Sequence, residues 1–507
     1  VGSEMCIRDR SKMKIKMKIA GKLWGLSAIL LFVSCAKGFD DNETFSGGVT
    51  NTQLESPENI SFSTLTNADG SESLKLTWPV VMGAGGFKVN VYNMNDPVNP
   101  AAVVADSIVD GSSMVFPKLE DTNYRVTVQT MGNEKLNNKD AQTATTQDYK
   151  AFAAVATIHE SDEIAAYVNA HIQDFSQDQE QCFVLEPGGV YTLDDIADFK
   201  LNTVTFRGDK DNRPTIKVSA NGGLVTQGGL KIKYINFECT DMSSQKGVLC
   251  LSENPDASIT TDALGYTNDG ANSGFYVINS PIIFQECNFR NIPNSLIYGN
   301  KKNYGIKDFR ITNCIVQLNN EGSYSVIDFN GGGWIKDLRV ENSTFYNLNT
   351  TCSGYFVRYS SSSNAQPKKT WGNTDNTGSI TITYNTFCKT MANKDFANQL
   401  PNTNTLTTTV QYNIFYDCWR LYQAIQSQAK RYTDGNTIWG ITKASEGNDT
   451  GGRTDSNGKP YATLEDPNFE GPIDLSFDLA QPKGGVNFKP NGSVAVGNKA
   501  GDPRWYK

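Results

Sequence analysis

The sequence predicts an all-β protein in which a small β-sandwich is followed by a long β-solenoid. Short runs of alternating apolar and polar residues, separated by turn residues, fill residues 55–148. After them, a strand-like unit recurs with a period of about 28 residues, which is typical of a solenoid. The length of 507 residues agrees with two to four domains, and a content of 10% aromatic and 20% charged residues excludes wholesale disorder.

The charge balance excludes several classes of function. The net charge is −8, and residues 1–34 contribute +5 from seven Lys/Arg and two Asp/Glu, so the rest of the chain carries −13. A nucleic-acid binder needs a positive surface that releases counterions from phosphates, so we expect no nucleic-acid partner. The only two histidines, His159 and His171, argue against histidine-based zinc sites and Ser-His-Asp triads.

The start of the chain predicts an export signal rather than part of the fold. Residues 1–12 resemble non-native read-through sequence, and Met13 is the better start. A lysine-rich stretch then precedes the apolar segment Leu23–Val33, which is too short to span a bilayer core of about 30 Å. Residues 13–35 are therefore expected to be a signal peptide.

The end of this segment, Leu31-Phe-Val-Ser-Cys35, resembles the lipobox of bacterial lipoproteins, in which the cysteine thiol takes a diacylglycerol. An ordinary secretory signal with a chance cysteine is the alternative. The acidic cluster within residues 36–43 is similar to the surface-export tag of Bacteroidota lipoproteins, and residues 36–54 suit a flexible tether. The resemblance implies lipidation at Cys35 and an outer-membrane lipoprotein exposed at the cell surface.

Residues 55–148 show the two-residue period of a sandwich. The alternating runs are Leu74–Trp78, Phe87–Tyr92 and Tyr124–Gln129. The tryptophan that ends an early strand and the sequence Leu119-Glu-Asp-Thr-Asn-Tyr124 before a late one resemble a fibronectin type III module, in which Tyr124 would form the corner hydrogen bond. We see no cluster of titratable residues in these runs, so a spacer role is favoured over glycan binding.

Residues 149–507 contain the repeat, whose copies end at Phe206, Phe237, Phe289, Val316, Phe345, Phe387 and Phe415. Four of the intervals between successive ends fit one coil each. We interpret the longest interval, from Phe237 to Phe289, as two coils, and the interval from Phe345 to Phe387 as one coil with an inserted loop. Small polar residues two positions before the ends are expected to stack at each bend and satisfy backbone groups: Cys287, Cys314, Ser343, Asn385 and Asn413.

This repeat resembles the right-handed parallel β-helix of the pectate-lyase-like superfamily. Coils stacked at about 4.8 Å bury a continuous core, whereas an antiparallel sandwich requires a hairpin turn about every 8–12 residues. We expect Ser161–Ala170 to form an N-capped amphipathic helix that closes one end and Phe183–Tyr191 to form a first strand and turn. Gly501–Trp505 is expected to be the closing segment.

The layout as a whole also resembles Bacteroidota surface lipoproteins of polysaccharide-utilisation systems, whose β-helical halves carry names of unknown function. The resemblance implies a polysaccharide as partner, and an outer-membrane complex of the SusC/SusD type as a further one. It points to a glycan context rather than to a particular activity.

Besides Cys6 and Cys35, eight cysteines lie in the predicted β-helix, and the absence of a CxxC pair argues against zinc ribbons. Cys287 and Cys314 share a repeat position, so their side chains would point in parallel, which is a poor geometry for a disulfide. Buried thiols are therefore favoured, although an exported protein leaves disulfides open.

Polysaccharide lyases of this fold family use an Arg or Lys base and carboxylates that hold calcium, because the uronate carboxyl must be neutralised. In this chain the second strands of three coils align so that Tyr298, Asp328 and Arg358 stack along one face. The resemblance implies Arg358 as the candidate catalytic base, with Tyr298 and Asp328 as candidate substrate-binding residues.

The insertion 360–373 follows this strand and extends the candidate site. It adds further substrate-binding candidates beside Tyr359: Lys368, Lys369 and Trp371. The indole would stack on a sugar ring, and the lysines would contact uronates. The structural alternative is an ion pair between Asp328 and Arg358, with both lysines merely solvated.

The sequence shows no calcium-binding pattern, because the acidic residues of the loop-rich stretch lack ligand spacing: Glu253, Asp256, Asp262 and Asp269. We identify no cofactor and expect calcium only for a lyase. The leading hypothesis is binding of an acidic, pectin-like polysaccharide in a groove of the β-helix. Cleavage by β-elimination is the first alternative, and a structural or adhesive surface protein is the second.

Overall fold

The computed structural model describes residues 48–507 except 68–70, 173–179, 350, 392, 420, 422–427, 441–453, 472–476 and 482. The predicted signal peptide and Cys35 lie outside the described residues. The described residues divide into a sandwich unit, made of residues 48–92 with 101–117 and 125–147, and a β-helix unit, made of residues 93–100, 118–124 and those described within 148–507.

The sandwich unit contains two sheets. One has the order β1 (Ser61–Thr66), β2 (Glu72–Thr77), β5 (Ser113–Pro117), and the other β4 (Ala101–Val109), β3 (Gly86–Asn93), β6 (Tyr124–Met131), β7 (Thr145–Tyr149); the short helix η1 spans Glu134–Leu136. Trp78 meets Phe87 edge-on at 5.5 Å between ring centroids. The Tyr124 hydroxyl accepts a bond from the Leu119 amide at 2.8 Å, which confirms the predicted corner contact. The type III assignment itself stays a prediction.

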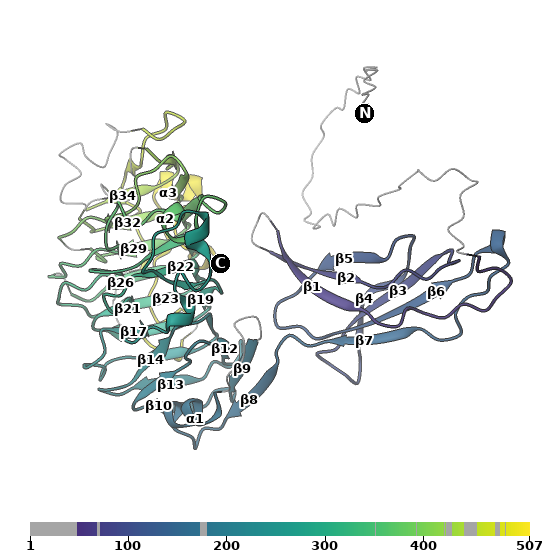
Figure 1. The fold of residues 1–507 in the computed structure, drawn as a ribbon. Coiled ribbons are helices and arrows are strands. Elements are labelled where there is room, and N and C mark those ends of the chain that lie inside the picture. The colour runs from purple at the N-terminus through teal and green to yellow at the C-terminus, as the bar shows by residue number, and fades with distance from the viewer. Residues whose placement is uncertain are drawn as a thin grey trace. The chain divides into compact units, whose positions relative to one another are not determined.

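The β-helix unit consists of three parallel sheets, and Figure 1 shows its strands stacked one above another. The ten-stranded sheet contains β10 (Val190–Leu193), β13 (Thr215–Val218), β16 (Asn236–Glu238), β20 (Asn288–Ile292), β23 (Ile315–Leu318), β26 (Thr344–Asn347), β29 (Thr386–Cys388), β32 (Ile414–Tyr416), β34 (Thr437–Trp439) and β35 (Thr463–Leu464). The seven-stranded sheet contains β11 (Ile196–Asp198), β14 (Gly223–Thr226), β17 (Gly247–Leu251), β21 (Ser295–Tyr298), β24 (Ile327–Asp328), β27 (Val357–Arg358) and β30 (Ala397–Asn398).

The third sheet has eleven strands, namely β8 (Ala154–Ile158), β9 (Glu180–Leu185), β12 (Thr203–Arg207), β15 (Leu230–Lys233), β19 (Ile282–Gln285), β22 (Tyr304–Thr312), β25 (Trp334–Glu341), β28 (Gly378–Thr383), β31 (Leu406–Gln411), β33 (Lys430–Tyr432) and, paired with β22, β18 (Tyr276–Ile278). From β12 to β32 the chain visits the eleven-, ten- and seven-stranded sheets in turn. This path is that of a parallel β-helix, as the sequence predicts.

The predicted aromatic column fills the core behind the ten-stranded sheet. Five phenylalanines, all fully buried, follow the strands of this sheet, and the rings of neighbouring members stack at 4.9–5.3 Å: Phe237, Phe289, Phe345, Phe387 and Phe415. Val316 fills the gap in register between Phe289 and Phe345. The prediction that a copy of the repeat ends at Phe206 is wrong, because Phe206 lies in the eleven-stranded sheet and pairs with Ile232.

Two intervals of the repeat reflect insertions. Phe237 pairs directly with Phe289, so the interval between them is one coil and the interpretation as two coils is wrong. The extra residues include β18 and the short helices η2 (Ala257–Ile259) and η3 (Tyr266–Asp269). The interval between Phe345 and Phe387 is one coil with an inserted loop, as predicted, and this loop contains α2 (Pro367–Trp371).

A ladder of buried asparagines forms the bend between the eleven- and ten-stranded sheets. Asn385 donates to the Val340 carbonyl at 2.8 Å, and its Oδ1 accepts from the Ser343 amide at 3.0 Å. Asn413 and Asn436 repeat this pattern in the next coils. Tyr384 and Tyr412, which directly precede Asn385 and Asn413, have left-handed backbone conformations with φ of 57° and 56°, and the chain bends there. The predicted polar stack is confirmed.

Three helices complete the description of the β-helix unit. Helix α1 (Ile164–His171) packs its buried residues Ile164, Ala165 and Val168 against the core. Its N-cap is Glu163 and not Ser161, because the Glu163 carboxylate accepts from the Ala166 amide at 2.6 Å. The remaining helices are α3 (Ser493–Asn498) and η6 (Pro503–Tyr506).

The eight cysteines of the β-helix unit are free and buried, which agrees with the expectation of thiols. Burial raises the pKa of Cys250 and of Cys418 to about 11, so both thiols stay protonated at neutral pH. Among the described residues, no helix is long and apolar enough to cross a membrane.

Candidate functional site

Each of the three sheets of the β-helix presents an outer face, and the face of the ten-stranded sheet is covered from β23 to β32. Trp505, Phe477 and Phe488 pack there against the outward side chains of Tyr346 and Cys388. The indole Nε1 of Trp505 also donates to Thr344 Oγ1 at 2.8 Å. A ligand face must therefore be sought on the other two sheets.

The seven-stranded sheet carries the column that the sequence predicts. Tyr298, Asp328 and Arg358 are in register on β21, β24 and β27, so the alignment is confirmed. The Asp328 carboxylate is only 3% exposed, and its two oxygens accept from the amides of Ser325 and Asn330 at 2.9 and 2.8 Å. Burial raises the pKa of Asp328 even though these bonds and Arg358 oppose the shift. Asp328 thus holds a turn together.

Among the described contacts, Arg358 and Asp328 form no direct salt bridge, and their interaction is limited to the charge of Arg358, which lowers the pKa of the Asp328 carboxyl. The Arg358 guanidinium instead lies 5.6 Å from the ring centre of Tyr355 and stays partly exposed. Tyr298 is 4% exposed, and burial raises the pKa of its hydroxyl to about 12. A catalytic role for Arg358 stays a prediction.

The insertion that contains α2 is placed differently from the expectation. Trp371 is 2% exposed, meets Trp334 edge-on at 5.2 Å and donates through Nε1 to Asn279 at 3.2 Å. Tyr359 is likewise buried and packs against Phe329. Both belong to the hydrophobic core, so an open stacking platform at Trp371 is wrong.

The two lysines of α2 remain accessible in part. Lys368 is exposed, while Lys369 is partly buried and donates through Nζ to the Ser363 carbonyl at 2.6 Å. Their contact with uronates stays a prediction.

Two acidic residues of the longer insertion serve local structure. Asp256 caps η2 by accepting from the Ser258 amide at 2.8 Å, and Asp269 accepts at 2.7 Å from the amide of Thr374, which directly follows the other insertion. Within the described ranges, no group of three or more His, Cys, Asp or Glu residues lies close enough to hold a metal ion.

The eleven-stranded sheet carries a charged outer face that the sequence reasoning missed. We call this the charged face, and define it by Arg207, Lys231, Lys233, Asp308, Arg310, Asp337 and Arg339. These residues alternate with buried apolar ones along β12, β15, β22 and β25. The signal was present in the runs Asp308–Thr312 and Asp337–Glu341, where a carboxylate, an arginine and a third polar residue occupy every second position.

The middle of the charged face stacks like charges on neighbouring strands. Arg310 is in register with Arg339, and Asp308 with Asp337, at the strand spacing of about 4.8 Å. Within β22 the Arg310 guanidinium binds both oxygens of Asp308, at 2.9 and 2.5 Å. The side chains of Arg310 and Arg339 are 25% and 37% exposed. Arg339 lies 3.9 Å from Glu341 of its own strand, so the repulsion between the stacked arginines is offset only in part. Side chains that oppose stability in this way are typical of binding surfaces.

Hydroxyl groups continue the same columns on the next two strands. Arg339 is in register with Thr381 and then Thr409, and Asp337 with Ser379 and then Thr407. These four hydroxyl side chains are partly exposed. Because a hydroxyl both donates and accepts, such a ladder can bind the hydroxyls of a sugar chain.

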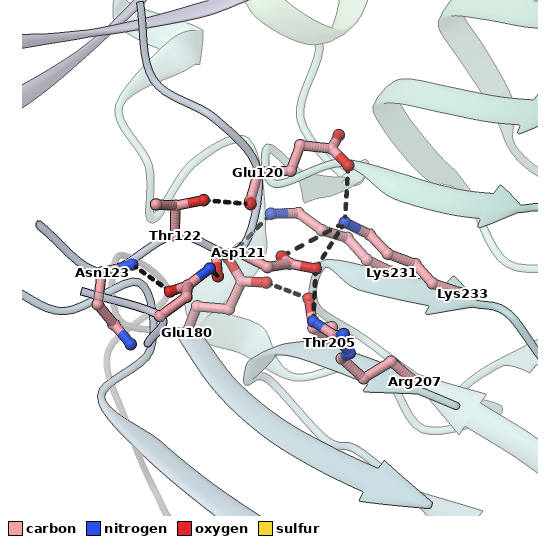
Figure 2. Close-up of polar contacts among 10 residues, drawn as sticks. Glu120, Asp121, Thr122, Asn123, Glu180, Thr205, Arg207, Lys231 and Lys233 are labelled. Atoms are coloured by element: carbon pink, nitrogen blue, oxygen red, sulfur yellow. Dashed lines mark hydrogen bonds and ion pairs between the residues drawn. The ribbon is translucent and has the colours of Figure 1, made fainter. Parts of the chain in front are cut away.

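The other end of the charged face is a second group of cations, which we call the Lys233 cluster (Arg207, Lys231 and Lys233; Figure 2). Lys233 Nζ lies 3.1 Å from Glu120 Oε2 and 3.4 Å from Asp121, and Arg207 Nη1 lies 3.0 Å from Asp121 Oδ2. The two carboxylates come from residues 118–124, which group with the β-helix unit.

The remaining cation of the cluster, Lys231, pairs with Glu180 of β9 at 2.9 Å. The pKa of the Glu120 carboxyl is lowered: partial desolvation raises it, but the charge and hydrogen bond of Lys233, the charge of Lys231 and a hydrogen bond from Gln285 together outweigh that effect. The ammonium group of Lys233 is thus matched by ionised carboxylates at neutral pH.

Sequence comparison links the chain to domains without assigned function. Residues 10–186 match a domain of unknown function, DUF4992, and residues 189–348 match a second one, DUF4957. The junction of the two matches lies between β9 and β10, inside the β-helix unit. No curated protein matches the chain.

Among solved structures, the chain is similar to the pectate lyase PelI from Erwinia chrysanthemi, solved in complex with tetragalacturonic acid. The identity is 10%, the match covers 57% of this chain and 85% of that one, and the TM-score is 0.12. The β-helix follows from the strand order itself.

Proposed function

We propose that the protein binds an acidic polysaccharide along the charged face of the eleven-stranded sheet, and that it does so as a lipid-anchored protein at the cell surface. The observation that carries the proposal is the in-register pair Arg310 and Arg339, continued by the hydroxyl column of Thr381 and Thr409. Guanidinium groups bind carboxylates in a fixed two-point geometry, and hydroxyls suit the neutral parts of a sugar chain.

The regular spacing of the face supports a polymer rather than a small ligand. Two successive strands carry arginines in register and the next two carry hydroxyls in the same column, so a chain molecule with carboxyl and hydroxyl groups would meet a row of polar contacts. Each contact is weak, because Arg310 already pairs with Asp308 and stays partly in water. Several of them acting together would give useful affinity.

On the charged face, binding is favoured over cleavage because Arg310 is already paired with a carboxylate; cleavage with Arg358 as the base remains the alternative. A base for β-elimination must be free to accept a proton, whereas Arg310 donates to Asp308 through two nitrogens. Cleavage is the competing outcome, and it would show itself as unsaturated products that absorb ultraviolet light.

The proposal is tested by removing the two stacked arginines together. Arg310→Ala with Arg339→Ala is expected to weaken binding to polygalacturonate by about tenfold or more, since charge-assisted hydrogen bonds contribute about 1.5–3 kcal/mol each before screening by water is counted. Retardation in affinity gels that contain polygalacturonate measures the loss.

The matched control is Lys368→Ala with Lys369→Ala, which removes the same charge from the site that the sequence predicts. We expect its retardation to stay near that of the unchanged protein. If the lysine variant loses binding while the arginine variant keeps it, the site lies at α2 and the assignment to the charged face is wrong.

The anchoring part of the proposal rests on the lipobox at residues 31–35. Cys35→Ala is expected to leave the protein unlipidated, so that it disappears from the membrane fraction and takes up no labelled palmitate, while Cys6→Ala changes neither. Continued labelling of the Cys35 variant would rule out the lipobox. A SusC/SusD-type complex remains the proposed membrane partner.

A further inference from the structure

The Lys233 cluster continues the columns of the proposed binding face. Lys231 is in register with Ile283 and, one strand on, with Arg310. Lys233 follows the parallel column through Gln285. A polysaccharide lying on Arg310 and Arg339 would therefore reach this cluster if it continued across β19, past Ile283, to β15.

The coils themselves supply too few carboxylates for the cations of the cluster. Glu180 neutralises Lys231, whereas the described ion pairs of Arg207 and Lys233 are made with Glu120 and Asp121 alone. Without these two residues, the surface formed by β9, β12 and β15 would hold three cations and one carboxylate.

Burial makes a partner for Lys233 obligatory. Its side chain is 2% exposed, and an ammonium group so far removed from water needs an anion beside it. Of its two partners, Asp121 is 15% exposed and is also held by Arg207, whereas Glu120 is 63% exposed. Figure 2 shows the Glu120 carboxylate reaching Lys233 from a different side than Asp121 does.

We propose that Lys233, beside the pair of Arg207 with Asp121, forms a carboxylate-binding subsite for a uronate of the polysaccharide, and that Glu120 occupies the position of the uronate carboxylate in the unbound protein. This inference rests on the proposed function, since it assigns a subsite at the end of the same face. Binding there exchanges one carboxylate for another, so the buried ammonium group keeps its counter-charge throughout. Glu120 thus competes with the ligand and limits its affinity.

The test is Glu120→Gln, which removes the competing charge but keeps the length of the side chain. Titration with an oligogalacturonate, followed by calorimetry, is expected to show affinity at least about threefold higher than in the unchanged protein, because an internal competitor is lost. Addition of Lys233→Gln to this variant should abolish the gain. A neutral cello-oligosaccharide of equal length should show no gain.

The matched control is Glu134→Gln, an exposed glutamate of η1 that changes the net charge by the same amount. If Glu134→Gln raises affinity as much as Glu120→Gln does, the effect is one of overall charge and the subsite is refuted. If Glu120→Gln leaves affinity unchanged or lowers it, Glu120 is only a structural partner of Lys233, and the subsite is again refuted.

The two proposals fail in different ways. Should the Arg310 and Arg339 double variant lose binding while Glu120→Gln has no effect, the charged face stands and the subsite falls. Should the unchanged protein and the Glu120 variant both fail to bind oligogalacturonate and polygalacturonate, both proposals fall.

Discussion

Replacement of Asn413 by leucine is expected to destabilise the β-helix by about 2–6 kcal/mol. Two buried backbone groups lose their partners, the Ile382 carbonyl at 2.8 Å and the Asn385 amide at 2.9 Å, and each unpaired buried group costs about 1–3 kcal/mol. Leucine has a similar size, so the loss reports the hydrogen bonds rather than a cavity. The urea midpoint of unfolding measures it.

Serine at the same position is the matched control. Ser343 fills the equivalent place two coils earlier, where its hydroxyl accepts from the Cys314 amide at 3.0 Å and donates to the Glu341 carbonyl at 2.8 Å. Asn413→Ser should therefore retain a substantial part of the stability that Asn413→Leu loses. Equal midpoints for the leucine variant and the unchanged protein would show that the ladder is dispensable.

Truncation of Phe345 to alanine is expected to cost about 3–5 kcal/mol, because it opens a cavity in the middle of the aromatic column. The ring of Phe345 stacks on Phe387 at 5.3 Å and meets Phe356 edge-on at 4.9 Å, and all three residues are fully buried. Phe345→Leu, which keeps most of the volume, should cost less than half as much. Losses of similar size for leucine and alanine would show that the column is loosely packed.

The repeat was predictable because the spacing of the phenylalanines along the sequence is set by their packing in one buried column. Phe289, Phe345 and Phe387 must fall in register, since a slip by one residue would turn each ring outward. What the period could not reveal is which of three sheets a strand joins. Phe206 shows this, because β12 has the same alternation as the strands of the ten-stranded sheet although it belongs to another.

The inserted segments were the second limit of prediction. Direct pairing of Phe237 with Phe289 shows that an insertion can be as long as a coil, so the interval alone does not count coils. Trp371 was placed on the surface because it lies in such an insertion. The indole is buried because the insertion folds back and packs on Trp334, a contact that depends on β25 of the preceding coil.

The candidate site was predicted only in part for the same reason. The register of Tyr298, Asp328 and Arg358 follows from their equal spacing along the sequence. The carboxylate of Asp328 accepts hydrogen bonds from two amides of its own turn. These bonds depend on the backbone conformation, which could not be predicted from the residue type. The sequence shows that Arg310 and Arg339 are charged. That both lie side by side on one outer face could be recognised only once the order of the strands was known.

The segment Gly501–Tyr506 changes how the coils depend on one another. In a solenoid each coil contacts only its neighbours, so local opening can begin anywhere and stop after one coil. Here the Gly501 amide binds the Tyr412 carbonyl at 2.7 Å, and Asp502 binds the hydroxyls of Thr386 and Thr344 at 3.1 and 2.8 Å. Three successive coils are thereby joined into one cooperative folding unit, because none of them can separate without releasing the segment that holds the other two.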